Sequence, residues 1–199
     1  MFEKRIPARE LKGCEFPEQN LYVMVNKFEE TTLKDFIKDC EKVLQTGQEF
    51  LPIVIDSYGG ECYTLLGMLD FLKHVGVKVV TVSQGKAMSC GAVLFSCGYE
   101  RYVGPTCTIM VHEVSGGFWG KNVEIQNDAK EVERLNKMLF AILDKNTGHK
   151  TGYWWSLLET QKHVDIFLTP EQAKKHNLAT HIGIPHIETK VEVTRSLVL

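Results

Sequence analysis

Ser89 lies in the part of the sequence best suited to chemistry, the small residues 87–92. A strand-like run, 77–83, precedes it, and an apolar run, 92–95, follows it. Where a strand turns sharply into a helix at a serine, the hydroxyl leaves the packed interior and the first helical N–H groups can stabilise an oxyanion. Because serine is also a preferred helix cap, this segment alone leaves two interpretations open, a nucleophile and a cap.

His112 and Asp165 are the candidates for the base and the carboxylate that a nucleophilic serine requires. His112 follows the apolar run 106–111, and Asp165 precedes the apolar residues 166–168. Taken alone, His112 is better explained as a core histidine than as a base, and Asp165 is better explained as a turn residue than as a catalytic carboxylate. A position at the end of a strand favours His112 as a base, and a buried imidazolium partner would stabilise the Asp165 carboxylate. Histidines in polar, helical or terminal contexts are expected on the surface: His149, His163, His176, His181 and His186.

Gly59, Gly60 and Cys90 are candidates for binding an oxyanion. The two glycines follow the strand-like run 51–55, and consecutive glycines let the backbone approach a ligand closely, although a plain turn also explains them. Cys90 stands at the expected start of a helix, where the pKa of a thiol tends to fall, so it is a rival nucleophile. We predict instead that Cys90 is an apolar neighbour whose backbone N–H acts.

Strands and helices are expected to alternate along the chain, which predicts an α/β fold with a mainly parallel sheet and right-handed crossovers. At the carboxyl ends of such strands, Ser89, His112 and Gly59 should meet at one rim. A long helix over 122–146 is expected to project or to serve in assembly. Strands are expected at 21–25, 51–55, 77–83, 101–103, 106–111 and 179–182, and residues 165–168 are expected to be short and extended. Thr32 is expected to cap a helix over 33–44, and the other helices pass through 65–72, cover 151–159 and start at Pro170.

The composition fits one domain over residues 1–199, with an irregular lead-in at 1–19 and a tail at 187–199. A formal net charge of −2 argues against a nucleic-acid partner, and no apolar run is long enough to span a membrane. The N-terminus lacks the apolar core of a secretory signal. Six cysteines without CxxC pairs give no metal-ligand spacing, so we expect buried thiols, a cytoplasmic location and no cofactor.

Four motifs, in order along 21–186, resemble those of the ClpP proteases, a family of self-compartmentalising serine peptidases. Residues 55–60 are similar to the family's Asn-Ser-Pro-Gly-Gly turn, with Asp56 and Tyr58 in place of its Asn and Pro. Residues 85–92 resemble the nucleophile motif. Ile109 to His112, followed by Gly116 and Gly117, resembles the histidine strand and the substrate-binding segment, and residues 165–169 resemble the segment with the aspartate.

The resemblance implies a ClpP/crotonase-like fold and a serine endopeptidase that acts on unfolded proteins or peptides. Ser89 would be the nucleophile, His112 the base and Asp165 the orienting carboxylate. Gly59 and Cys90 would supply the oxyanion-hole N–H groups. Gly60, Gly116 and Gly117 would bind substrate, with the 116–117 segment pairing with an extended peptide.

The resemblance also implies partners. The long helix would be the handle through which rings of this chain stack into a barrel, and a ring-shaped ATPase would unfold substrates. Val164 stands where the family commonly has a basic residue that helps to lock ring contacts. Three other functions remain open: a crotonase-like acyl-CoA enzyme, a phage-type head-maturation protease and a protease-like assembly subunit.

Overall fold

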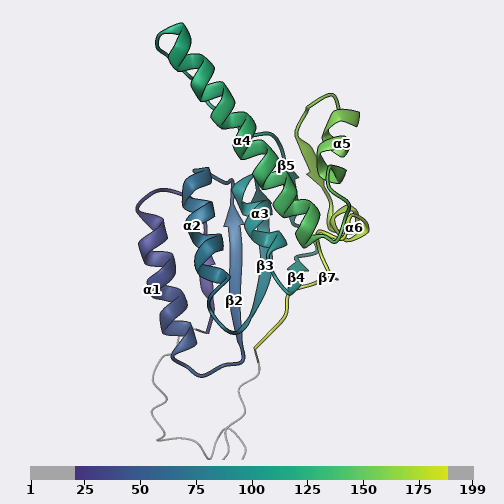
Figure 1. The fold of residues 1–199 in the computed structure, drawn as a ribbon. Helices are drawn as coiled ribbons and strands as arrows, with labels where there is room; N and C mark the ends of the chain where they lie inside the picture. Colours follow the sequence, from purple (N-terminus) through teal and green to yellow (C-terminus); the bar gives the residue numbers. More distant parts are fainter. Residues whose placement is uncertain (1–20, 188–199) are drawn as a thin grey trace, which may run out of the picture.

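Strands and helices alternate through the first half of the computed structural model, which describes residues 21–187 (Figure 1). The predicted lead-in 1–19 lies outside the described residues, as does the predicted tail 187–199 apart from its first residue. The elements of this half are β1 Val23–Val25, α1 Thr32–Leu44, β2 Phe50–Ser57, α2 Cys62–Leu72, β3 Lys78–Met88 and α3 Cys90–Ser96.

Shorter strands and the long helix make up the second half. Its elements are β4 Glu100–Val103, β5 Thr108–Val111, α4 Asn122–Asn146, α5 Tyr153–Thr160, β6 Ile166–Leu168, α6 Pro170–Lys175 and β7 His181–Ile182. Each lies within a few residues of its predicted range, and α4 has the predicted bounds.

The described strands form one mainly parallel sheet, as predicted. Its main path runs β1-β2-β3-β4-β7, and β5 lies parallel to β3. β6 pairs antiparallel with β5, with Ile166 opposite Val111. Because of this reversal, the start of β6 lies beside the end of β5. Asp165 and His112, which adjoin those two ends, are thereby brought to the same rim.

β3 is longer than the predicted strand 77–83. It pairs with β4 through Val80 to Ser83 and then with β5 through Lys86 to Met88. Between these stretches Gly85 has a φ of +87°, and a Cβ there would lie 2.9 Å from an Asp56 carboxylate oxygen. The Lys86 ammonium is 2.7 Å from the same carboxylate. The polar stretch around Gly85 and Lys86 is therefore part of the strand, and the strand leads directly to Ser89.

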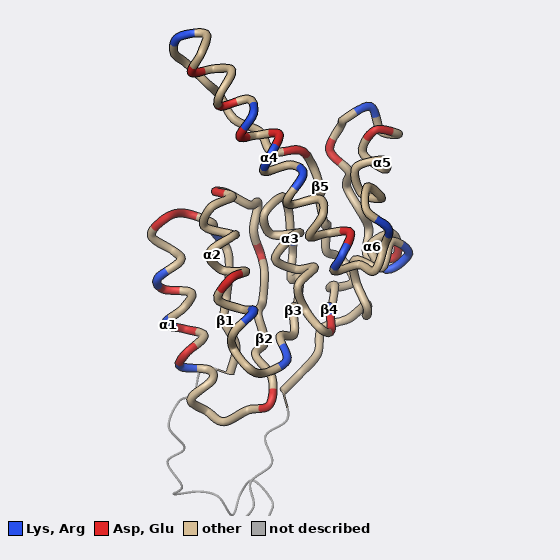
Figure 2. The backbone as a smooth tube through the Cα atoms, in the orientation of Figure 1, with Lys and Arg blue, Asp and Glu red and all other residues tan. Residues whose placement is uncertain are grey.

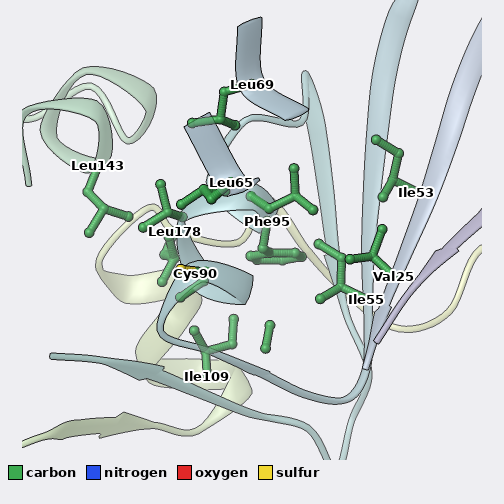
Figure 3. Packing of buried hydrophobic residues seen from close by; sticks show 14 of the residues in the cluster. Val25, Ile53, Ile55, Leu65, Leu69, Cys90, Phe95, Ile109, Leu143 and Leu178 are labelled. Carbon is green, nitrogen blue, oxygen red and sulfur yellow. The ribbon is translucent and has the colours of Figure 1, made fainter. Parts of the chain in front are cut away.

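The hydrophobic core lies between the sheet and the helices that cover it (Figure 3). Phe95, Leu65 and Ile55 are among its fully buried side chains. In the described part of the chain all five cysteines are free thiols: Cys40, Cys90 and Cys107 are buried, and Cys62 and Cys97 are half-buried.

The α4 helix has two different halves. Its buried residues begin at Leu135 and continue to Asp144, so only its second half packs against the body. The first half projects from the body and contains both basic and acidic residues (Figures 1 and 2). None of the helices in residues 21–187 is both long and apolar enough to cross a membrane.

Two of the histidines expected on the surface, His149 and His176, are instead half-buried against the aromatic α5 helix. The His149 ring stacks on Tyr153 with 3.7 Å between ring centroids. The Tyr153 hydroxyl is 2.7 Å from Nδ1 of His176. Burial lowers the pKa of His176, with the nearby Lys175 charge acting in the same direction. The surface expectation was wrong here because it ignored the shielding that the aromatic residues provide.

A smaller correction concerns the start of α1. Thr31, not Thr32, occupies the N-cap position, and it makes no side-chain capping bond. The Thr32 hydroxyl instead donates to the Glu29 carbonyl, 2.8 Å away.

Candidate active site

Ser89 stands in a strained turn between β3 and α3. Its φ of 56° and ψ of −121° lie in a region that non-glycine residues rarely adopt, at a cost of about 1–3 kcal/mol. Its N–H donates to the Met110 carbonyl at 2.9 Å, which ties the turn to β5. On the other side, a Cβ on Gly59 would lie only 2.7 Å from the Ser89 Cβ. A glycine is therefore needed at 59 to let the strained turn fit.

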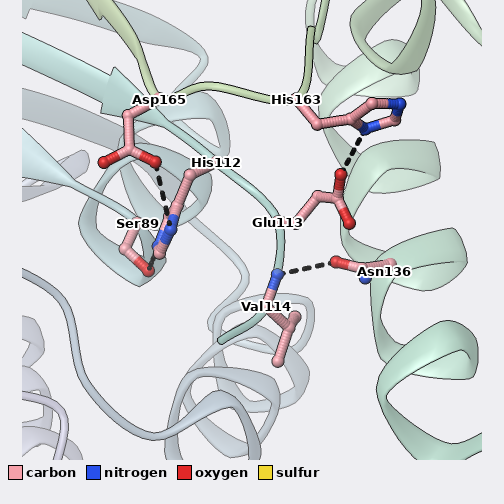
Figure 4. Close-up of polar contacts among 7 residues, drawn as sticks. All are labelled: Ser89, His112, Glu113, Val114, Asn136, His163 and Asp165. Atoms are coloured by element: carbon pink, nitrogen blue, oxygen red, sulfur yellow. Dashed lines mark hydrogen bonds and ion pairs between the residues drawn. The ribbon is translucent and has the colours of Figure 1, made fainter. Parts of the chain in front are cut away.

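The His112 imidazole is hydrogen-bonded to Ser89. Its Nε2 lies 2.8 Å from the Ser89 Oγ, a distance at which the hydroxyl can donate its proton to the ring (Figure 4). The parallel register of β3 and β5, with Met88 opposite Met110, places the two residues side by side. The imidazole is mostly shielded from solvent, with 20% of its side chain exposed. The pair has the geometry of a nucleophile and its base.

Asp165 stands on the other side of the imidazole but is not hydrogen-bonded to it. Its Oδ1 lies 3.8 Å from Nδ1 of His112, and 47% of its side chain is exposed. A hydrogen bond would require an approach of about 1 Å. Such distances in an unliganded site often shorten when substrate binds.

The two predicted oxyanion donors differ in their surroundings. In α3 the Ala92 N–H donates to the Ser89 carbonyl at 2.9 Å, so the Cys90 N–H precedes the helical hydrogen bonds. The Gly59 N–H, in contrast, donates to Oγ of the buried Ser57 at 3.1 Å. An oxyanion bound at Gly59 would have to share or replace this hydrogen bond.

A cavity of about 60 Å³ lies beside Ser89 and includes Gly60 in its wall. The strand bridge between Gly60 and Phe28 holds this wall in place. Gly116 and Gly117 are absent from the lining, which Val114 and Ser115 supply instead. The two glycines are exposed and lie against the rings of the following aromatic residues, Phe118 and Trp119.

Asn136, Glu113 and His163, for which the sequence predicts no functional role, connect the segments around His112. The buried Asn136 of α4 accepts a hydrogen bond from the Val114 N–H at 2.7 Å. Glu113, directly after His112, contacts the imidazole of His163, which lies two residues before Asp165 (Figure 4). The chain neighbours of His112 and Asp165 are thus linked to each other. In the sequence, the signal for Glu113 and His163 was their closeness to the candidate residues His112 and Asp165.

Cys90 has no thiolate character that would make it a rival nucleophile. Its thiol donates a hydrogen bond to the Gly60 carbonyl oxygen at 3.2 Å, and the neighbouring Cys62 and burial raise the pKa of Cys90. A hydrogen bond that Cys90 can give to ionised Cys62 lowers the pKa of Cys62 to about 7. Since only 2% of Cys90 is exposed, its side chain is a buried neighbour of the serine.

A comparison with known protein families identifies the class to which this fold and site belong. The family model described as Clp protease matches residues 24–185, which include every candidate site residue. The chain therefore belongs to the Clp protease family. This membership confirms the resemblance drawn from the four motifs and the expected mainly parallel α/β fold, and it places the protein among the peptidases.

Proposed function

We propose that this protein is a serine endopeptidase that cleaves unfolded proteins or peptides through an acyl-enzyme at Ser89. The observation that carries this proposal is the 2.8 Å contact between His112 Nε2 and the Oγ of Ser89. The strained backbone at Ser89 supports it, because such strain persists only where neighbours enforce it and is frequent at catalytic nucleophiles.

In the proposed reaction, the Ser89 Oγ attacks the peptide carbonyl carbon while its proton moves to His112 Nε2. The oxyanion accepts hydrogen bonds from the N–H groups of Cys90 and Gly59, the latter turning from Ser57. The intermediate collapses when His112 passes the proton to the leaving amine. Water then attacks the acyl-enzyme by the same route and releases the acid. Asp165 orients His112 and stabilises the imidazolium after closing the 3.8 Å gap.

The proposal extends to substrate binding and assembly. An extended peptide would lie along the 116–117 segment, next to Gly60, by strand addition. Copies of a single domain would form rings. The projecting half of α4, where Val123 and Ile125 are 66% and 40% exposed, would supply contacts between copies. A ring-shaped ATPase would deliver substrates in the cytoplasm, where free thiols such as those described are maintained.

Hydrolysis of a fluorogenic peptide by the full chain tests the proposal. We expect Ser89→Ala and His112→Ala each to lower kcat by at least about 10³-fold. Ser156→Ala, an exposed change on α5, is the matched control and should retain wild-type turnover. Full turnover in Ser89→Ala would contradict the proposal. Binding of an acyl-CoA by calorimetry, with no peptide cleavage, would favour a crotonase-like enzyme instead.

A further inference from the structure

Two cysteine thiols face each other at the cavity beside Ser89. Cys62 is the first residue of α2, and Cys90 is the first residue of α3. Both line the same cavity as Ser89 and His112. The catalytic scheme uses the backbone N–H of Cys90 but gives neither thiol a task.

The two thiols line one small cavity, and they differ in access. The Cys90 thiol donates a hydrogen bond to the Gly60 carbonyl oxygen at 3.2 Å, and it can turn to the Cys62 sulfur when Cys62 is ionised. Cys90 is buried, whereas Cys62 is half-buried and open to the cavity. A cavity of about 60 Å³ exceeds the roughly 10–15 Å³ that one water requires, so a small oxidant can reach Cys62.

Cys62 is also the reactive member of the pair. A thiolate at the first turn of a helix is stabilised by the unpaired N–H groups there. With the hydrogen bond from Cys90 in addition, the pKa of Cys62 falls to about 7, so a large fraction is thiolate at neutral pH. Burial raises the pKa of a thiol, to about 12 for Cys40 and to about 11 for Cys97, and at Cys62 the hydrogen bond outweighs it.

We propose that Cys62 and Cys90 form a reversible disulfide in the presence of a peroxide and that this bond switches off Ser89. The effect on Ser89 rests on the proposed function; the formation of the disulfide does not. In the first step the Cys62 thiolate attacks one peroxide oxygen, the O–O bond breaks, and Cys62 sulfenic acid and hydroxide form. In the second step the Cys90 sulfur displaces the sulfenic hydroxyl, which leaves with the Cys90 proton as water. The two sulfurs lose two electrons, and the peroxide gains them.

The disulfide would act on the oxyanion hole. An S–S bond of about 2.0 Å requires the two sulfurs to move into covalent contact. Cys90 must then leave the Gly60 carbonyl, and the turn at Gly59 and Gly60 becomes tied to the start of α3. These backbone segments carry the two proposed donors, Gly59 N–H and Cys90 N–H. Because the donor nitrogens must lie about 2.7–3.1 Å from the developing oxyanion, a small displacement of either donor should impair the oxidised site.

The test uses the full chain, hydrogen peroxide and two independent readouts. Peptide mapping without reductant should show a Cys62–Cys90 cross-link in the oxidised protein. Labelling of Ser89 by a fluorophosphonate should fall at least tenfold after oxidation and recover with dithiothreitol. After peroxide treatment, Cys62→Ser should be labelled at the same rate as untreated Cys62→Ser. The control Cys97→Ser, also at α3, should lose labelling after peroxide as the wild type does.

Absence of the cross-link after peroxide treatment would overturn the proposal. A cross-link with unchanged labelling would overturn the switch. If the reduced protein does not label at all, the proposed function fails, but the peptide map still decides whether the disulfide forms. The two failures are therefore distinguishable.

Discussion

His112 is hydrogen-bonded to Ser89, yet its other ring nitrogen lies 3.8 Å from Asp165, beyond hydrogen-bond distance. If Asp165 closes this gap during the reaction, its loss should greatly slow hydrolysis. We expect Asp165→Asn to lower kcat by about 10³–10⁴-fold with little change in KM, because the imidazole loses the group that fixes its tautomer. The rates of peptide hydrolysis by the wild type and Asp165→Asn give kcat and KM. A fall in kcat of less than threefold would remove Asp165 from the proposed triad.

The contact between Glu113 and His163 should position Asp165. It joins the residue after His112 to the segment that precedes Asp165. We expect His163→Ala to lower kcat by up to about 10²-fold, with KM little changed, because misplacement by 1 Å can have this effect. The free energy of unfolding should change by less than about 0.5 kcal/mol, because the pair lies at the surface, with 49% and 35% of the two side chains exposed. Val164→Ala, an exposed neighbour, is the control, and equal turnover in both variants would contradict the prediction.

Asn136 should matter for stability because it satisfies the Val114 N–H from a buried position. Asn136→Ala leaves this N–H without its acceptor, so we expect the free energy of unfolding to fall by about 1–3 kcal/mol. Urea unfolding followed by circular dichroism measures it. Gln126→Ala, on the exposed half of the same helix, should lie within about 0.5 kcal/mol of the wild type. Equal midpoints for the two variants would show that the hydrogen bond does not stabilise the fold.

The thiol of Cys62 should react at unusually low pH. Since its pKa is about 7, the rate of alkylation by iodoacetamide should rise with pH and reach half its maximum near pH 7. In Cys90→Ala the midpoint should move upward, because the hydrogen bond that lowers the pKa is lost. Rates read from the Cys62 peptide by mass spectrometry test both statements. An unshifted midpoint in Cys90→Ala would contradict the assigned cause.

His176 should make the fold sensitive to acid. Burial lowers its folded pKa, so the unfolded chain binds the proton more readily. Its neutral form then contributes fully to stability above the unfolded pKa of about 6.5, and this contribution is lost as the pH falls toward the folded pKa. Between pH 7.5 and 5.5 the urea concentration at the midpoint of unfolding should fall less in His176→Gln than in the wild type. An equal fall in both proteins would show that His176 does not cause the acid sensitivity.

The positions of Ser89 and His112 could be predicted because both adjoin the ends of apolar strands, and parallel strands bring such ends together. The antiparallel pairing of β6 could not, because a three-residue strand contains no signal of its direction. The full length of β3 was missed because its polar Lys86 is stabilised by a distant residue, Asp56. Local sequence does not contain that pairing.

Some parts of the site depend on packing alone. Gly116 and Gly117 do not line the cavity and lie instead beside the rings of Phe118 and Trp119. Cys62 gave no signal as a lone cysteine, and it shares a cavity with Cys90 only because α2 and α3 begin near one another in the fold. The 3.8 Å gap at Asp165 likewise depends on the exact placement of two segments.

The most direct test of the central claim is to map the fluorophosphonate adduct on the full chain by tandem mass spectrometry. The account predicts one adduct, on Ser89, whose rate of formation falls at least about 10²-fold in His112→Ala because the base is lost. An adduct that forms on another residue, or that forms on Ser89 at the same rate without His112, would contradict it.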